Sequence, residues 1–220
     1  MTITHLVTHS GGFHADELLS SVILTRLYPQ AQLVRSRDAA WITPAADRII
    51  YDVGGQFDAA LQISDHHQRP NPLRPDGHPF SSFGLIWAQY GRDYLRALAV
   101  PEHDLEVIHA AFDRRFVLPV DMLDTGAVSA CEAGPLVAGL TLPLLLETLK
   151  PVFDDIAEGA DDRAFAPALP IAAALVEAQI RRKAAKYRAT ALVMAAIEAA
   201  GAGRVLELPM GMPFHAAIHA

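Results

Sequence analysis

Cysteine, surplus positive charge and long apolar runs are all scarce in this sequence. The single cysteine, Cys131, excludes an intramolecular disulfide and is typical of a protein in a reducing compartment. Lysine and arginine number 18 against 25 acidic residues, so the net charge of -7 gives no overall basic field to attract nucleic acid. A nucleotide substrate is still compatible with this balance, because bound divalent cations would offset local carboxylates.

No run of 18 apolar residues occurs, and the stretch "TLPLLLETL" is short and interrupted by Pro143 and Glu147. The first residues, "MTITHLVTHSGGFHADELL", lack the basic and long apolar segments of a secretory signal. We therefore expect no membrane span and a cytoplasmic location. With 51% hydrophobic and 20% charged residues, the 220-residue chain has a globular composition and can bury one sizeable core.

Apolar, β-branched segments alternate with helical patterns in the first half of the chain. This alternation predicts an α/β fold with a mostly parallel sheet flanked by helices. We expect a helical second half over 141–200, with a loop at 158–167, and a short C-terminal strand at 204–210. Helices are expected at 11–27, 79–100, 102–116 and 173–201, and strands at 3–10, 31–36, 47–55, 60–67 and within 117–126.

Acidic and histidine side chains follow most of the expected strands. In an open parallel sheet, ligands bind beyond the carboxyl ends of the strands. Carboxylates gathered there would repel one another, and divalent cations would remove the conflict. His and Asp ligands without a thiolate suit Mn²⁺, and also Mg²⁺, Fe or Zn²⁺. The residues concerned are His9, His14, Asp16, Glu17, Asp52, Asp65, His66, His67, Asp121 and Asp124.

Five segments in a fixed order carry a resemblance to a known family. They are "HSGGFHADE", "YDVGG", "DHHQ", "SSFGLIW" and "VDMLDTG". This order resembles the DHH phosphoesterase superfamily of exonucleases, manganese pyrophosphatases and cyclic-dinucleotide phosphodiesterases. It is most similar to the Myg-type branch, named for a melanocyte-proliferating gene. The resemblance covers residues 5–126 strongly and 205–214 more weakly.

The resemblance implies two divalent cations, most readily Mn²⁺, and a water activated between them. His9, His14 and Asp52 would bind the first cation, and Asp16, His66 and Asp121 the second, with Asp52 bridging both. His67 would face the substrate phosphate, while Asp65 would orient a histidine or nearby backbone. Arg114 or Arg115 could clamp phosphate oxygens. The activity implied is a metal-dependent phosphoesterase, a 3'–5' exonuclease acting on RNA or oligonucleotides.

Several alternatives stay open at this point. Asp121 is favoured over Asp124 as the ligand because it comes first after the expected strand. Ser81 and Ser82 suit a helix N-cap as well as a phosphate-binding pair. Glu17 suits the first turn of a helix through the helix dipole. The segment "RRKAAKYR" at 181–188 is more typical of a solvated helix face than of a nucleic-acid patch.

The domain organisation also follows from the resemblance. Residues 1–200 would form the DHH-type domain, and 201–220 would be the remnant of a C-terminal domain that relatives have in full. A short version of this kind could act on a small phosphate compound, such as pyrophosphate or a cyclic dinucleotide. It could instead be a non-catalytic metal-binding protein, or pair into a homodimer through the C-terminal helix and strand.

Overall fold

The fold is built around a five-stranded sheet. The computed structural model describes residues 2–129, 138–203 and 205–218, so Cys131 lies outside the described residues. The strand order is β2-β1-β3-β5-β4, and only β4 runs antiparallel to its neighbour. This mostly parallel sheet among helices confirms the predicted α/β class. The strands are β1 (His5–Thr8), β2 (Gln32–Arg35), β3 (Arg48–Tyr51), β4 (Phe57–Asp58) and β5 (Ile63–Ser64).

The two faces of the sheet bury different hydrophobic clusters. Leu6 of β1 pairs in register with Ile49 of β3, and both belong to the large core. Their chain neighbours Val7 and Ile50 point to the opposite face, where they pack with Ile63 in a smaller cluster. This is the period-two alternation of a strand buried on both sides.

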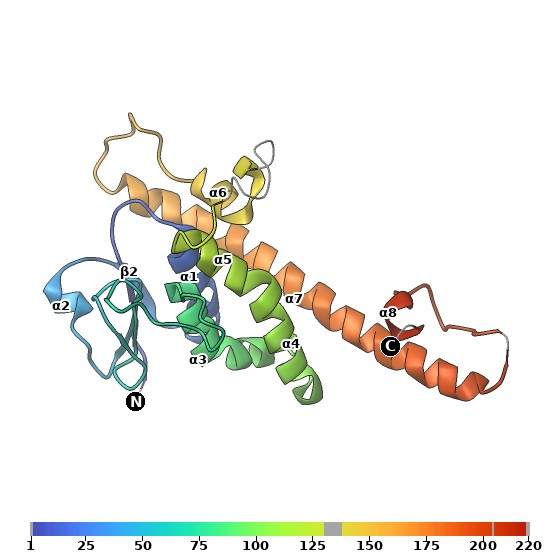
Figure 1. Ribbon diagram of the computed structural model, residues 1–220. Helices are drawn as coiled ribbons and strands as arrows, with labels where there is room; N and C mark the ends of the chain where they lie inside the picture. The colour runs from blue at the N-terminus through green and yellow to red at the C-terminus, as the bar shows by residue number, and fades with distance from the viewer. Residues whose placement is uncertain (1, 130–137, 204, 219–220) are drawn as a thin grey trace.

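Helices cover these faces unequally. The large core lies between the sheet and α1 (Ala15–Leu27), α3 (Ser82–Ala97) and α7 (Ala160–Ala200), with α1 packed against both of the others. On the opposite face, the short α2 (Ala39–Ile42) contributes Trp41 and Ile42. Because α1 is covered by the sheet and by two helices, its first turn is held firmly at the edge of the sheet (Figure 1).

A single helical rod follows α3, where a helix was predicted over 102–116 and a strand within 117–126. It consists of η1 (Glu102–Asp104), α4 (Leu105–Phe112), the π-helical segment η2 (Asp113–Val117) and α5 (Leu118–Asp124). The strand predicted within 117–126 is therefore wrong. Val117, Val120 and Asp121 are all buried at spacings of three and four residues, which is the helical period.

The second half of the chain is helical, as predicted. It contains η4 (Ala138–Leu140), α6 (Leu142–Glu147), α7 and α8 (His215–Ile218). Two expectations fail, because the supposed loop at 158–167 is helical from Ala160 and residues 205–210 form no strand. The distal half of α7 extends beyond the rest of the molecule, and α8 packs against it (Figure 1).

No helix in the described ranges is both long and apolar enough to cross a membrane. The division of the chain at residue 200 stays a prediction.

Candidate metal centre

Strand ends and helix ends deliver acidic and imidazole groups to one pocket. His9 follows β1, Asp52 follows β3, and the run from Asp65 follows β5. Asp16 lies in the first turn of α1, and Asp124 is the last residue of α5. The pocket has a volume of about 630 Å³ and includes all of these residues in its lining. The carboxyl edge of the parallel sheet is therefore where the chemistry gathers, as the sequence predicts.

Asp52 lies at the centre of this cluster. It has a left-handed backbone conformation, with φ of 55°, which aspartate tolerates better than most residues. Its Oδ2 lies 3.3 Å from Nε2 of His9, and its Oδ1 lies 3.3 Å from Nε2 of His66. Ser82 also donates a hydrogen bond to Oδ1 at 3.1 Å. Burial raises the pKa of Asp52, but these two histidines outweigh burial and lower the pKa below its usual range.

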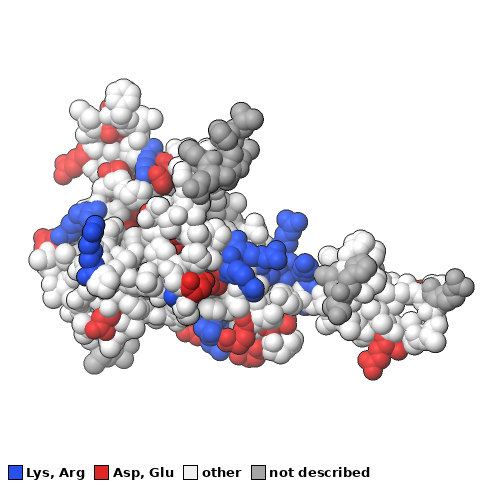
Figure 2. Space-filling view, viewed as in Figure 1, with Lys and Arg blue, Asp and Glu red and all other residues white. Residues whose placement is uncertain are grey.

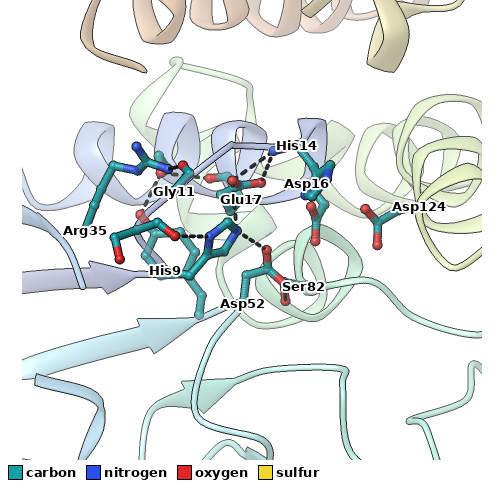
Figure 3. Close-up of polar contacts among 12 residues, drawn as sticks. His9, Gly11, His14, Asp16, Glu17, Arg35, Asp52, Ser82 and Asp124 are labelled. Atoms are coloured by element: carbon teal, nitrogen blue, oxygen red, sulfur yellow. Dashed lines mark hydrogen bonds and ion pairs between the residues drawn. The ribbon is translucent and has the colours of Figure 1, made fainter. Parts of the chain in front are cut away.

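Glu17 lies on one side of the cluster. The sequence indicated only that it suits the first turn of a helix, and did not indicate its contact with His9. Its carboxylate accepts hydrogen bonds from the backbone N–H of His14 at 2.9 and 2.8 Å, and Oε1 lies 3.0 Å from Nε2 of His9 (Figure 3). The spacing His14-x-x-Glu17 is that of a capping residue and its partner, and this spacing could have been read from the sequence. Burial lowers the pKa of His9, but Asp52 and Glu17 together raise it to about 10.

Asp16, His66 and Asp124 form the other side. Nε2 of His66 lies 3.4 Å from Oδ2 of Asp124 and 3.8 Å from Oδ2 of Asp16. Burial raises the pKa of Asp16 well above its usual value, and the neighbouring charges of Asp52 and Asp124 raise it further. Burial likewise raises the pKa of Asp124. Without a cation, the carboxylates of Asp16, Asp52 and Asp124 repel one another.

The cluster fits divalent cations by two observations. Oδ2 of Asp16 is buried and accepts no hydrogen bond from any residue in the described part of the chain. In addition, one potential ligand atom from each residue lies within 4.8 Å of the others in several overlapping groups. These include His9 with His14 and Glu17, Asp16 with His66 and Asp124, and Asp52 with His66 and His67. Nitrogen and oxygen donors of this kind suit Mn²⁺, Mg²⁺, Fe or Zn²⁺.

Asp65 and His67 also line the pocket. Asp65 is buried, and its carboxylate accepts hydrogen bonds from the backbone N–H groups of Gly55, His66 and His67. Its Oδ1 also lies 2.7 Å from Nδ1 of His67, whose side chain is 62% exposed. The carboxylate thus holds an accessible imidazole in place. These are the contacts expected of an orienting aspartate, although its part in catalysis stays a prediction.

Asp121 lies outside the groups of potential ligand atoms. It is fully buried and paired with Arg74, whose Nη2 and Nε donate to Oδ2 at 2.6 and 3.1 Å. The hydroxyl of Ser81 and the backbone N–H of Gly84 donate to Oδ1. Burial raises the pKa of Asp121 to about 6, although Arg74 acts in the opposite direction. The geometry favours Asp124 over Asp121 as the ligand, because Asp124 alone of the two reaches the pocket.

The predicted substrate-binding residues occupy different places. Ser81 and Ser82 donate to buried carboxylates, and neither is among the residues that line the pocket. Arg114 and Arg115 line a separate groove. Arg37, which no sequence pattern indicated, is the arginine beside the candidate metal centre.

Comparison with known proteins places this geometry in a family context. Residues 5–220 match the model of the family MYG1_exonuc, described as "Uncharacterised protein family (UPF0160)". A MYG1 protein of Schizosaccharomyces pombe is 36% identical over 175 residues, which cover 74% of this chain and 52% of that protein. The human protein named "MYG1 exonuclease" is 33% identical over 141 residues, covering 58% of this chain and 37% of the human one.

A MYG1 protein of Saccharomyces cerevisiae is 31% identical over 95% of this chain and 67% of its own length. The chain therefore spans about half the length of the fission-yeast relative and less of the human one. No solved structure matches the chain. Because the family match covers nearly every residue and the relatives agree with it, the chain belongs to the MYG1 family.

Proposed function

We propose that this protein is a metal-dependent phosphoesterase that acts as a 3'–5' exonuclease on RNA or oligonucleotides. The observation that carries the proposal is the place of Asp52, which contacts His9 on one side and His66 on the other. A central carboxylate between two ligand groups can be shared by two cations about 3.5–4 Å apart. The name "MYG1 exonuclease" of mammalian relatives supports the same reaction class.

We assign the ligands of two cations, most readily Mn²⁺, with Mg²⁺, Fe or Zn²⁺ as alternatives. His9, His14 and Glu17 would hold the first, and Asp16, His66 and Asp124 the second, with Asp52 shared. Bound cations would act as Lewis acids and would lower the pKa of a water between them. Glu17 enters this set, and Asp124 replaces Asp121, because of their positions in the pocket.

The remaining pocket residues would bind and orient the phosphate. His67 is exposed, and Asp65 accepts the hydrogen bond of its Nδ1, which leaves Nε2 to donate to a phosphate oxygen when both ring nitrogens carry a proton. Arg37 lines the same pocket and would supply a permanent positive charge. Ser82 would keep the bridging carboxylate of Asp52 oriented through its hydrogen bond.

Hydrolysis of labelled RNA tests the proposal. The protein is incubated with Mn²⁺ and a short RNA carrying either a 5' or a 3' label. A 3'–5' exonuclease releases a 3'-labelled mononucleotide at once and shortens the 5'-labelled strand step by step. Asp52→Asn should abolish release, whereas the exposed Asp76→Asn should not alter it. Equal release by the Asp52 variant would exclude the proposal, and two bound metals without turnover would favour a non-catalytic metal-binding protein.

A small phosphate compound is the second candidate substrate. The pocket volume of about 630 Å³ is that of a small-molecule site. A panel containing pyrophosphate, a cyclic dinucleotide and a dinucleotide distinguishes the two candidates. Turnover of one of these compounds, with no release of nucleotides from longer RNA, would favour a small phosphate compound as the substrate.

We also propose a homodimer, now through α7 alone, since the predicted C-terminal strand is absent from the described residues. Ile171 and Leu175 of α7 are four residues apart, so they share one face of the helix, and they are 46% and 42% exposed. Sedimentation of the wild type and of Ile171→Glu/Leu175→Glu tests this assembly. A dimeric wild type and a monomeric variant are expected, and a wild type that sediments as a monomer would rule the dimer out.

A further inference from the structure

A second hollow in the molecule is lined by positive charge. It lies between the π-helical segment η2 and the middle of α7, and its volume is about 890 Å³. We call it the basic groove and define it by its five cationic residues. Figure 2 shows the concentration of blue where α7 passes the α4–η2 rod. The five residues are Arg114, Arg115, Arg182, Lys183 and Lys186.

No ion pair joins any of these five cations to a carboxylate in the part of the chain that the structure describes. Other arginines of the same chain are paired, as Arg92 is with Glu106 at 2.7 Å and Arg96 with Glu102 at 2.8 Å. In a chain of net charge -7, five unpaired cations in one groove require an explanation.

Four of the five cations are close enough to affect one another. Burial lowers the pKa of Lys183, and the charges of Arg115, Lys186 and Arg114 lower it further. Like charges held together in this way destabilise the folded protein unless an anion lies among them. The groove is therefore suited to a ligand that carries several negative charges.

The position of the groove indicates which polyanion it suits. Arg115 and Asp124 belong to one continuous helical rod, nine residues apart in sequence. At about 1.5 Å per residue, their separation along the axis is roughly 14 Å. That length corresponds to about four stacked nucleotides at roughly 3.4 Å each. A strand in the groove would thus be within a few nucleotides of the candidate metal centre.

The shape of the groove favours a nucleic-acid strand over a lipid surface. Its cations come from two elements that border a hollow, with Tyr187 at its side. A flat membrane contacts a plane or a ridge of cations, whereas a single strand can lie between two helices. An aromatic ring beside such a track is also a common stacking partner for a base.

We propose that the basic groove binds the sugar-phosphate backbone of single-stranded RNA a few nucleotides away from the strand end that enters the candidate metal centre. The choice of RNA as ligand rests on the proposed nuclease function. The segment "RRKAAKYR", which by itself suggests a solvated helix face, would then be part of a binding surface together with Arg114 and Arg115.

Binding measured without hydrolysis tests the groove separately from the metal centre. A fluorescent RNA of about 12 nucleotides is titrated with protein in the presence of a chelator, and its anisotropy gives Kd. Arg114→Gln/Arg115→Gln and Arg182→Gln/Lys186→Gln each remove two groove charges. Arg92→Gln/Arg96→Gln removes two charges from another surface and is the matched control. Circular dichroism checks that each variant melts like the wild type.

Each groove variant should raise Kd at least tenfold, and the control should not. Loss of two phosphate contacts should also reduce the slope of log K against log salt concentration by about 1.4. The wild type should bind the longer RNA at least tenfold more tightly than a dinucleotide. Unchanged Kd values, or binding to phosphatidylserine vesicles with none to RNA, would overturn the proposal. Weakened binding in the groove variants with no hydrolysis by the wild type would support the groove and reject only the nuclease function.

Discussion

At the scale of single residues, two aspartates one helical turn apart have different surroundings. Asp124 lies beside His66 and lines the pocket, while Asp121 is buried against Arg74, Ser81 and Gly84. Sequence alone could not separate them, because both follow an apolar segment and both are acidic. What separates them is Arg74, which is 47 residues away in the chain and occurs in no recognisable pattern.

Asp124→Asn should therefore reduce metal binding without unfolding the protein. The side chain of Asp124 is 15% exposed, and its neighbour His66 keeps Asp52 as a partner at 3.3 Å, so removing the charge of Asp124 does not leave a buried cation unpaired. We expect the variant to bind fewer than two cations per chain and to lose at least tenfold in phosphoesterase rate. Elemental analysis and a denaturation curve measure the two quantities on the same sample.

Asp121→Asn should instead destabilise the fold and leave the metal ligands in place. It removes the carboxylate that accepts two hydrogen bonds from Arg74, whose side chain is only 6% exposed, and leaves that guanidinium with the partly exposed Asp113 as its partner. Because Asp113 keeps part of the compensation, the loss should cost about 1–3 kcal/mol in the free energy of unfolding. If Asp121→Asn folds with wild-type stability but loses a metal, then Asp121 rather than Asp124 is the ligand.

At the scale of elements, the sequence predicted the parallel strands because their apolar residues are contiguous and local. It failed within 117–126, where β-branched Val117 and Val120 resemble a strand. The segment is helical because Val117, Val120 and Asp121 lie on one buried face of the helix. A hydrogen bond from Arg74 holds Asp121 in place on this face. The loop predicted at 158–167 fails for a similar reason. Phe165 packs edge-on against the buried Phe13, and this contact stabilises the start of α7 although Pro167 lies inside the helix.

The segment "SSFGL" at 81–85 shows how a motif can be structural and still serve the site. Ser81 and Gly84 bind Asp121, while Ser82 binds Asp52. A Cβ atom on Gly84 would lie 2.0 Å from Oδ2 of Asp121, which real structures do not allow. The start of α3 therefore links the buried ion pair of Asp121 to the central carboxylate of the candidate metal centre.

Gly84→Ala should disturb both the buried Asp121 and the hydrogen bond from Ser82 to Asp52. Relieving the clash requires Asp121 or α3 to move, and overpacking of this kind costs about 1–3 kcal/mol. We expect a lower melting temperature together with weaker metal binding, because Ser82 would shift relative to Asp52. Gly139→Ala is the matched control, since a Cβ there meets no atom of the described residues within 4 Å. Equal effects of the two substitutions would contradict the link.

At the scale of the whole molecule, the charge is separated between two sites. Carboxylates gather at the edge of the sheet, and unpaired cations gather in the basic groove. In the metal-free, ligand-free protein, the carboxylates around Asp16 repel one another, and so do the cations of the basic groove, although His9 and His66 offset part of the charge at the sheet edge. This separation is the pattern expected where function opposes stability.

Removal of metal should lower the melting temperature of the whole chain. A cation present at a hundredfold excess over its Kd stabilises the folded state by about 2.7 kcal/mol. For a protein of this size, each kcal/mol corresponds to roughly 2–4 °C. Removal of one such cation should thus lower Tm by about 5–11 °C and removal of both by about twice as much, and Mn²⁺ should restore it. A Tm that does not respond to chelator, on protein shown to have contained two metals per chain, would contradict a site formed at the core of the fold.

Asp16→Asn is the sharpest test of whether the metal site lowers the stability of the metal-free protein. Asp16 is buried, its Oδ2 has no hydrogen-bond donor in the described chain, and its pKa is raised by burial and then by the charges of Asp52 and Asp124. An amide in its place removes the repulsion but is a poorer ligand than a carboxylate. The variant should therefore melt at a higher temperature than the wild type in chelator, yet gain little from Mn²⁺. If Asp16→Asn is less stable than the metal-free wild type, then Asp16 supports the fold by itself and the carboxylate cluster does not need a cation.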